Sequence, residues 1–144
     1  QYYAKILRPE NRSWKVLEMS DKRFQFHDLF GGGNNYKWLP PTKTSLGLDS
    51  YGDKSESFNL IVHTMLLQQT WSFTNLIIKC YQMLKPGGFL IINCPWLSQD
   101  LTLKDYWRIS PKALAKIAED VGFEDGRIML WDDILTAGMV MKPK

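Results

Sequence analysis

Apolar residues occur along the chain in short runs that are separated by polar stretches, and their spacing predicts strands that alternate with helices. Six runs have strand length and are rich in β-branched and aromatic residues. They are "WKVLEM" (14–19), "YKWL" (36–39), "FNLIVH" (58–63), "GFLIINC" (88–94), "RIMLW" (127–131) and "TAGMVMK" (136–142). The second run ends at two prolines, which cannot donate to a strand ladder.

Two longer segments have the helical period. In residues 72–84, apolar side chains recur at three-to-four spacing and form one face. Residues 110–122 carry helix punctuation, with Ser110 as N-cap, Pro111 at the first position and Gly122 as C-cap. Shorter helices are predicted in "QYYAKIL" (1–7) and within "DKRFQFHDLF" (21–30), and residues 42–57 are predicted to be loop.

Strands that are apolar on both faces, joined by helices, indicate an α/β fold with a mostly parallel sheet that is covered on both sides. The last two strands follow the last helix, so we expect them to form an antiparallel pair at one edge. With 144 residues, the chain is predicted to form a single domain over 1–144.

The charge, hydropathy and cysteine content of the chain argue against several classes of function. The formal charge of +3 is spread evenly, whereas a nucleic-acid footprint would be clustered, so nucleic acid is an unlikely partner. No run has the length of a membrane span, and "QYYAKILRPE" lacks the apolar centre of a signal peptide. Cys80 and Cys94 lie in apolar segments at no metal-ligand spacing. We expect buried free thiols, no metal and a cytoplasmic location.

Residues 58–123 resemble the second half of class I methyltransferases that use S-adenosylmethionine (SAM), of the methyltransferase type 11 kind. The matching pieces are "SESFNLIVHTMLLQQTW", "LIIKCYQMLKPGGFLIINCPW" and "DYWRISPKALAKIAEDVGF". The resemblance implies a Rossmann-like fold, SAM as cofactor and methyl transfer to a small-molecule or glycan acceptor. In such sheets the ligand lies at the carboxyl ends of the strands, near the switch point.

The first half departs from that family. "KVLEM" is similar to its first strand and has Glu18 in the usual acidic position, but the following turn, "SDKRF", lacks glycine. "GGGNN" (31–35) lies too far along the chain to replace it. The 38 residues from 20 to 57 are too few for two βαβ crossovers, each of roughly 30 residues. No acidic residue follows "YKWL". The first half is therefore predicted to be shortened, and the SAM site altered or lost.

The resemblance implies cofactor contacts at the ends of the strands and in the loop before residue 58. The candidates are Glu18, Ser20, Asp49, Ser50, His63 and Thr64. The alternatives are that Glu18 is a helix-cap or surface acid and that Asp49 lies in an exposed turn.

His63 is also a candidate general base, because an unperturbed imidazole titrates near pH 6.5. The alternative is a histidine that only forms a hydrogen bond at a strand end. Gln68 and Gln69 occupy the positions of a Glu-His pair in the family and cannot transfer protons.

Tyr106, Trp107 and Arg108 are candidates for acceptor binding. The alternative is that Trp107 packs the following helix onto the sheet. Three functions stay open. The first two are SAM-dependent methyl transfer and an inactive methyltransferase-like scaffold that binds a protein partner. The third, a nucleic-acid modifier or RNA-associated subunit, is motivated only by the slightly basic composition and the aromatic residues.

Overall fold

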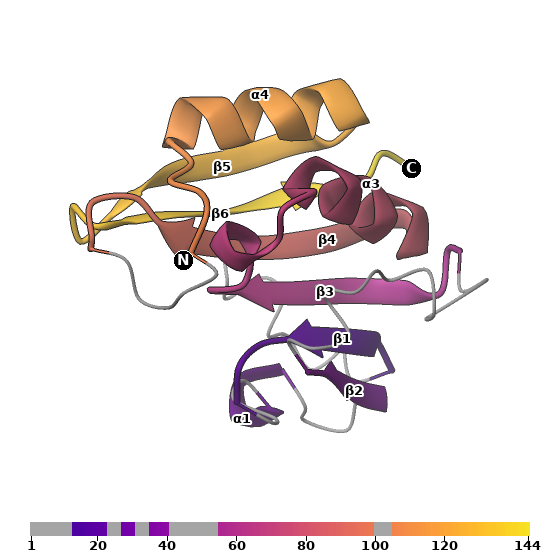
Figure 1. The fold of residues 1–144 in the computed structure, drawn as a ribbon. Helices are drawn as coiled ribbons and strands as arrows, with labels where there is room; N and C mark the ends of the chain where they lie inside the picture. Colours follow the sequence, from indigo (N-terminus) through magenta and orange to yellow (C-terminus); the bar gives the residue numbers. More distant parts are fainter. Residues whose placement is uncertain (1–12, 23–26, 31–34, 41–54, 100–104) are drawn as a thin grey trace.

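The computed structural model describes residues 13–22, 27–30, 35–40, 55–99 and 105–144. The described part holds one six-stranded sheet (Figure 1). Its strands are β1 (Lys15–Met19), β2 (Asn35–Leu39), β3 (Phe58–Thr64), β4 (Leu84–Pro95), β5 (Glu124–Trp131) and β6 (Leu135–Met141). The helices are α1 (His27–Phe30), the short 3-10 helix η4 (Leu67–Gln69), α3 (Phe73–Met83) and α4 (Pro111–Val121).

The strand order is β2-β1-β3-β4-β6-β5. The pairs β1–β2, β1–β3 and β3–β4 are parallel, whereas β6 is antiparallel to both β4 and β5. This confirms the α/β fold with a mostly parallel sheet and an antiparallel C-terminal pair. Because β2 and β3 lie on opposite sides of β1, the chain reverses its direction of winding there, which is a switch point.

Local sequence signals explain α4. Ser110 has extended backbone angles, and its hydroxyl accepts a hydrogen bond from the Ala113 amide, as an N-cap side chain does. Pro111 occupies the first turn, where its missing N–H costs nothing. Gly122 ends the helix with a φ of 117°, a conformation that favours glycine. The predicted bounds of this helix are confirmed.

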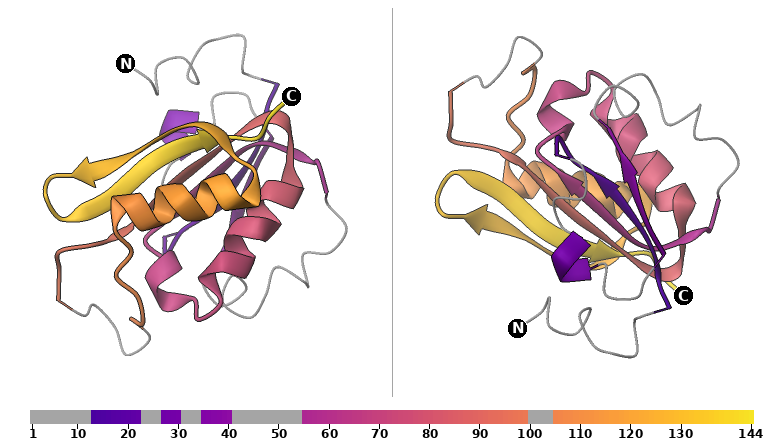
Figure 2. Two further views of the ribbon diagram at one scale, coloured as in Figure 1. Left: turned by 90° about the horizontal axis from the view of Figure 1, so that it is seen from above. Right: turned by 90° about the horizontal axis from the view of Figure 1, so that it is seen from below.

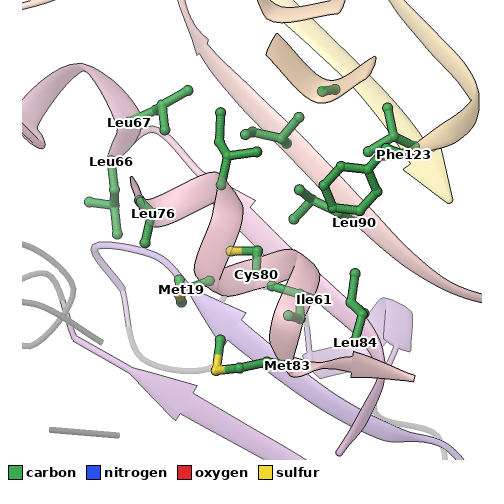
Figure 3. Close-up of a cluster of buried hydrophobic side chains, with 14 of the residues drawn as sticks. Met19, Ile61, Leu66, Leu67, Leu76, Cys80, Met83, Leu84, Leu90 and Phe123 are labelled. Atoms are coloured by element: carbon green, nitrogen blue, oxygen red, sulfur yellow. The ribbon is translucent and has the colours of Figure 1, made fainter. Parts of the chain in front are cut away.

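The main core lies between the sheet and the two longer helices, α3 and α4, which cover the same face (Figures 1 and 2). The apolar stripe of α3 supplies the buried residues Leu76, Ile77, Cys80 and Met83. Figure 3 labels Leu76, Cys80 and Met83 within this core. On this face, alternate strand residues such as Leu17 and Ile61 pack beneath the helices, since neighbouring strand residues point to opposite faces. The apolar face predicted for the helix in residues 72–84 therefore packs against this core.

The opposite face of the sheet carries a second, smaller apolar cluster, and α1 lies on this side (Figure 2). Phe30 of α1 is buried there against strand residues that include Val16, Leu60 and Val62. Helices therefore cover both faces, as predicted, although α1 has only four residues in the described part of the chain.

Strand β4 begins earlier than the sequence pattern indicates. Residues 88–94 form the predicted strand, but Leu84 already pairs with Phe58, and the next pair is Leu60 with Phe89. The intervening residues bulge, and Gly87 has a φ of 77°. The segment "KPGG" is thus built into the strand, because the non-local pairing with β3 continues on both sides of it.

Several predictions fall on residues outside the described ranges. They are the helix over 1–7, the "GGG" break and most of the predicted loop 42–57. Between Met19 and Phe58, the described residues form only α1 and β2. No helix in the described ranges is long and apolar enough to cross a membrane.

Candidate functional site

The three consecutive parallel pairings bring the carboxyl ends of four strands to one edge of the sheet. This edge, called the carboxyl edge below, is formed where β1, β2, β3 and β4 end. Met19 of β1 pairs with both Leu39 of β2 and His63 of β3. Ser20 and Thr64, which come next in the chain, are therefore neighbours at the switch point.

Glu18 is fully buried near the end of β1 and is held by neighbouring hydroxyl groups. The Ser20 hydroxyl lies 2.8 Å from one carboxylate oxygen, and the Tyr36 hydroxyl donates to the other at 2.9 Å. Burial, together with the charge of Glu18 and this hydrogen bond, raises the pKa of Tyr36 far above its ordinary value. The Trp38 indole N–H donates to the Ser20 carbonyl at 3.2 Å. Glu18 therefore fixes the turn that follows β1.

His63 is also fully buried, near the end of β3. Neither imidazole nitrogen has a hydrogen-bond partner in the described part of the chain. Burial disfavours the charged imidazolium and lowers the pKa of His63 to about 4. The side chain is therefore neutral at pH 7. To act as a general base, it would have to touch the methyl acceptor whose proton it removes. The predicted catalytic role is therefore not tested by this arrangement and requires exposure of the ring.

The segment after β3 is fixed by backbone and amide contacts. The Met65 amide donates to both the backbone carbonyl and the side-chain oxygen of Asn93, at 3.1 and 3.0 Å. The Gln68 amide group donates to the Met65 carbonyl at 2.7 Å, while its own Oε1 is buried without a partner among the described residues. Gln68 is thus part of the carboxyl edge, although it lacks the proton-transfer chemistry of an acid.

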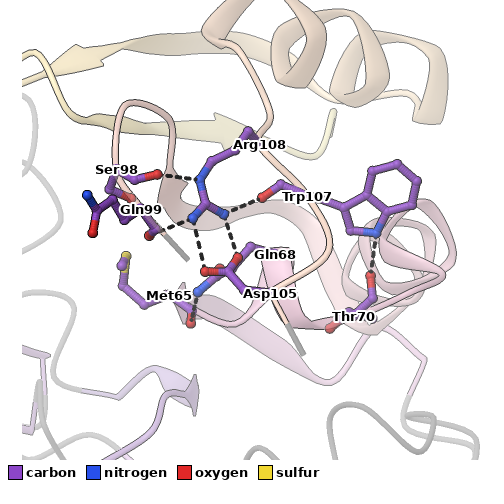
Figure 4. A network of polar contacts seen from close by, with 8 residues as sticks. All are labelled: Met65, Gln68, Thr70, Ser98, Gln99, Asp105, Trp107 and Arg108. Atoms are coloured by element: carbon purple, nitrogen blue, oxygen red, sulfur yellow. Dashed lines mark hydrogen bonds and ion pairs between the residues drawn. The ribbon is translucent and has the colours of Figure 1, made fainter. Parts of the chain in front are cut away.

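A short segment before α4, residues 105–108, crosses this edge and is called the strap below (Figure 4). The Tyr106 amide donates to the Gln68 carbonyl at 2.8 Å, which ties the strap to η4. The Arg108 guanidinium pairs with both carboxylate oxygens of Asp105 and also donates to the carbonyls of Ser98 and Gln99. Because the planar Arg108 guanidinium donates hydrogen bonds to all of these groups, it holds the strap in one geometry.

The aromatic side chains of the strap differ in exposure. Trp107 is half-buried, and its indole N–H donates to the carbonyls of Thr70 and Trp71 at 3.1 and 3.2 Å. Its ring packs edge-on against Phe73 at the start of α3, with centroids 5.1 Å apart. Tyr106 and Trp71 are largely exposed and contact each other edge to face, with centroids 5.5 Å apart. Trp71 was not among the residues predicted from the sequence.

No strong pattern in the sequence marks Trp71 as a site residue. The residue lies 35 positions before Tyr106 and follows η4 in a polar turn, where an isolated tryptophan carries no pattern. The one general indication in the sequence is its content of six tryptophans.

The predicted site residues fall into three groups. Glu18, Ser20, His63 and Thr64 come together on β1 and β3 at the switch point. Tyr106, Trp107 and Arg108 lie on the strap, next to the segment that follows β3. Asp49 and Ser50 lie outside the described residues.

Two other features supply no chemistry to this edge, although Cys94 lies near the end of β4. Cys80 and Cys94 are buried and unbonded, and burial raises the pKa of each thiol to about 12, so neither is a reactive thiolate. A cavity of about 460 Å³ lies between α4 and the start of β5, lined by residues that include Ala118, Phe123 and Ile128. It is far along the sheet from the switch point, because β5 is the opposite outer strand from β2.

No protein-family model matches the sequence, and no curated protein sequence matches it significantly. The fold, in contrast, has many solved counterparts.

Phosphoethanolamine N-methyltransferase 2 from Haemonchus contortus, in complex with SAM, is similar over 99% of this chain and 52% of its own, with 13% identity and a TM-score of 0.74. A SAM-dependent methyltransferase from Archaeoglobus fulgidus is similar over 98% of this chain and 93% of its own, with 12% identity and a TM-score of 0.71. The 1,6-didemethyltoxoflavin-N1-methyltransferase from Burkholderia thailandensis, with 1,6-didemethyltoxoflavin and S-adenosylhomocysteine bound, is similar over 100% of this chain and 78% of its own, with 15% identity and a TM-score of 0.66.

The chain spans about half the length of the first structures that it matches. At such low identity the likeness concerns the backbone arrangement rather than any activity. The strand order, the antiparallel C-terminal pair and these counterparts agree with the resemblance found in residues 58–123. The chain has the fold of class I SAM-dependent methyltransferases.

Proposed function

We propose that this chain binds SAM at the carboxyl edge and serves methyl transfer to a small-molecule or glycan acceptor. The observation that carries the proposal is the position of the switch point. The ends of β1 and β3 lie side by side there, and Glu18, Ser20 and Thr64 meet in a fold shared with SAM-dependent methyltransferases. Open α/β sheets bind nucleotide-like ligands at this place.

The described residues fit such a cofactor in part. His63 and the Gln68 Oε1 atom are buried polar groups without partners in the described ranges, and a bound ligand with amino and hydroxyl groups would supply partners. Glu18 already accepts hydrogen bonds from Ser20 and Tyr36, so its role would be to shape the turn at Ser20. The predicted contacts of Asp49 and Ser50 remain part of this proposal.

The main contribution of the protein to methyl transfer would be to position the acceptor relative to SAM. Bound SAM would supply an electrophilic methyl group on a sulfonium. The strap and the switch-point residues would hold the acceptor in line with that group, and orientation alone can supply much of a rate enhancement. A general base is not required for every acceptor, which is consistent with the burial of His63.

Calorimetric titration of SAM and S-adenosylhomocysteine into the purified protein tests cofactor binding. We expect micromolar binding of both ligands, weakened at least tenfold by Glu18→Gln and by Gln68→Leu. Glu124→Gln, which changes an exposed acid at the far side of the sheet, is the matched control and should bind like the wild type. Thermal melts establish that each variant is folded.

A folded protein that gives no heat with millimolar SAM would contradict the proposal. It would favour the second candidate, a scaffold without cofactor that binds a protein partner. One observation favours that candidate: Ser20, at the start of the turn after β1, is buried and bonded to Glu18, and this turn lacks the glycine of the resembling family. Transfer of a labelled methyl group to a cell extract would then be absent as well.

A further inference from the structure

Trp71 and Tyr106 form an exposed aromatic surface beside the carboxyl edge, called the aromatic shelf below. The two side chains are 69% and 48% exposed, which is unusual for rings of this size. Trp71 lies just after η4, and Tyr106 lies in the strap, so tertiary structure alone brings them together.

The Trp71 side of the shelf is supported by packed aromatic rings although it is exposed. The Trp71 ring lies against Trp107, with centroids 5.2 Å apart and the planes tilted by 32°. Trp107 is in turn fixed by its two indole hydrogen bonds and by Phe73. Aromatic rings held in place before a ligand arrives lose little conformational entropy on binding, so this arrangement suits recognition.

Among the described residues, the charged pair next to the shelf does not favour an ionic ligand. Asp105 is adjacent in the strap, but its side chain is only 1% exposed and is paired with Arg108 on both carboxylate oxygens. The two charges compensate each other, so this pair offers neither a counter-ion for an ammonium group nor an open cation for a phosphate or carboxylate. The Tyr106 hydroxyl makes no hydrogen bond within the described residues and can bind a polar group.

We propose that the aromatic shelf of Trp71 and Tyr106 binds a neutral sugar, with a pyranose ring stacked on the Trp71 indole and a ring hydroxyl bonded to the Tyr106 hydroxyl. A pyranose with equatorial hydroxyl groups presents an apolar C–H face to an aromatic ring and polar groups at its perimeter. This combination matches an exposed indole beside a free phenol. The inference deepens the proposed function by naming the acceptor class, and its description as an acceptor site rests on that function.

The test uses ligand-observed saturation-transfer NMR with cellotriose, in the absence of SAM. We expect transfer to the sugar C–H protons and a millimolar dissociation constant. Trp71→Ala should weaken binding at least tenfold, and Trp71→Phe should weaken it less. The backbone carbonyl of residue 71, which accepts from Trp107, is retained in both variants. Trp131→Ala is the matched control, because Trp131 is 57% exposed on β5, and it should bind like the wild type.

Three results would overturn the inference: no transfer to cellotriose, an equal loss in Trp131→Ala, or binding of caffeine or tetramethylammonium in preference to cellotriose. The last two probes represent planar neutral and cationic ligands. Because sugar binding is measured without cofactor, a failure of SAM binding in calorimetry leaves the sugar site standing, and a failure of sugar binding leaves the cofactor proposal standing. Melting temperatures should be nearly unchanged, because the mutated ring is mostly in solvent.

Discussion

At the scale of single residues, burial determines what His63 can do. Its imidazole is enclosed near the end of β3, and neither nitrogen has a partner in the described ranges. In the folded protein the pKa is lowered to about 4, whereas the unfolded chain has the ordinary value near 6.5. Below pH 6.5 the unfolded state therefore binds more protons than the folded state, and the folded state loses stability.

We predict that the free energy of unfolding is fully maintained above about pH 6.5 and falls by about 3 kcal/mol as the pH drops to about 4, from the His63 contribution alone. Urea unfolding of the wild type and of His63→Leu at pH 7 and at pH 5 measures this difference. The variant should lose much less stability between the two pH values. His27→Gln, which changes the other, exposed histidine, should behave like the wild type. Equal pH dependence in the wild type and His63→Leu would show that other groups are responsible.

Neighbouring side chains of the strap differ in the hydrogen bonds that they make. Tyr106, Trp107 and Arg108 are consecutive, and all three are predicted from the sequence to bind the acceptor. In the structure, the side chains of Trp107 and Arg108 donate hydrogen bonds to backbone carbonyls and to Asp105. The Tyr106 hydroxyl makes no hydrogen bond within the described residues. Acceptor binding by all three stays a proposal, and Tyr106 is the member best placed for direct contact.

At the scale of secondary-structure elements, the β5–β6 pair depends on one close approach. Gly138 of β6 pairs with Ile128 of β5 on one side and with Ile92 of β4 on the other. A Cβ atom at position 138 would lie 2.1 Å from the Arg127 carbonyl oxygen and 2.7 Å from the Ile128 Cα. Both neighbours are backbone atoms, which cannot move without changing the strand pairing.

We predict that Gly138→Ala destabilises the protein by about 3 kcal/mol, because the added methyl group forces β5 away from β6. Urea unfolding at pH 7 measures the change. Ala113→Ser, on the exposed side of α4, serves as the comparison and should change stability by less than about 0.5 kcal/mol. A Gly138→Ala protein as stable as the wild type would mean that the strands separate at this point without loss of pairing elsewhere.

At the scale of the whole molecule, stability should increase toward the centre of the sheet. Strands β3 and β4 have neighbours on both sides, and both faces of β3 are buried, whereas β2 and β5 lie at the two edges. The smaller core cluster beside α1 also holds fewer side chains than the one beneath α3 and α4. Backbone amides open most rarely where pairing and packing are most complete.

Hydrogen exchange followed by mass spectrometry checks this expectation. We predict the slowest exchange in β3 and in residues 89–94 of β4, and faster exchange in β2 and in the outer strand β5. Titration with SAM, if it binds, should slow exchange most at the ends of β1 and β3. Protection that is greatest in β2 would contradict the expectation that stability increases toward the centre of the sheet.

Much of the fold was predictable, because its signals are local. The cap residues of α4, the apolar run of β3 and the stripe of α3 each act within a few residues, and all three elements lie where the pattern indicates. The start of β4 at Leu84 was not predictable, since it depends on pairing with Phe58, which is 26 positions away. Only the pairing with β3 shows that the bulge at Gly87 lies within a strand.

The amino-acid sequence by itself determined the α/β class, the parallel arrangement of the central strands and the helix bounds, because periodicity, caps and turn residues act at short range. It also indicated that Glu18 and His63 stand near strand ends. Only the tertiary structure decided what these residues contact. The burial of His63, the bonds from Ser20 and Tyr36 to Glu18, and the meeting of Trp71 with Tyr106 all join residues on different elements. Burial and contact are properties of the packed chain, and no local pattern contains them.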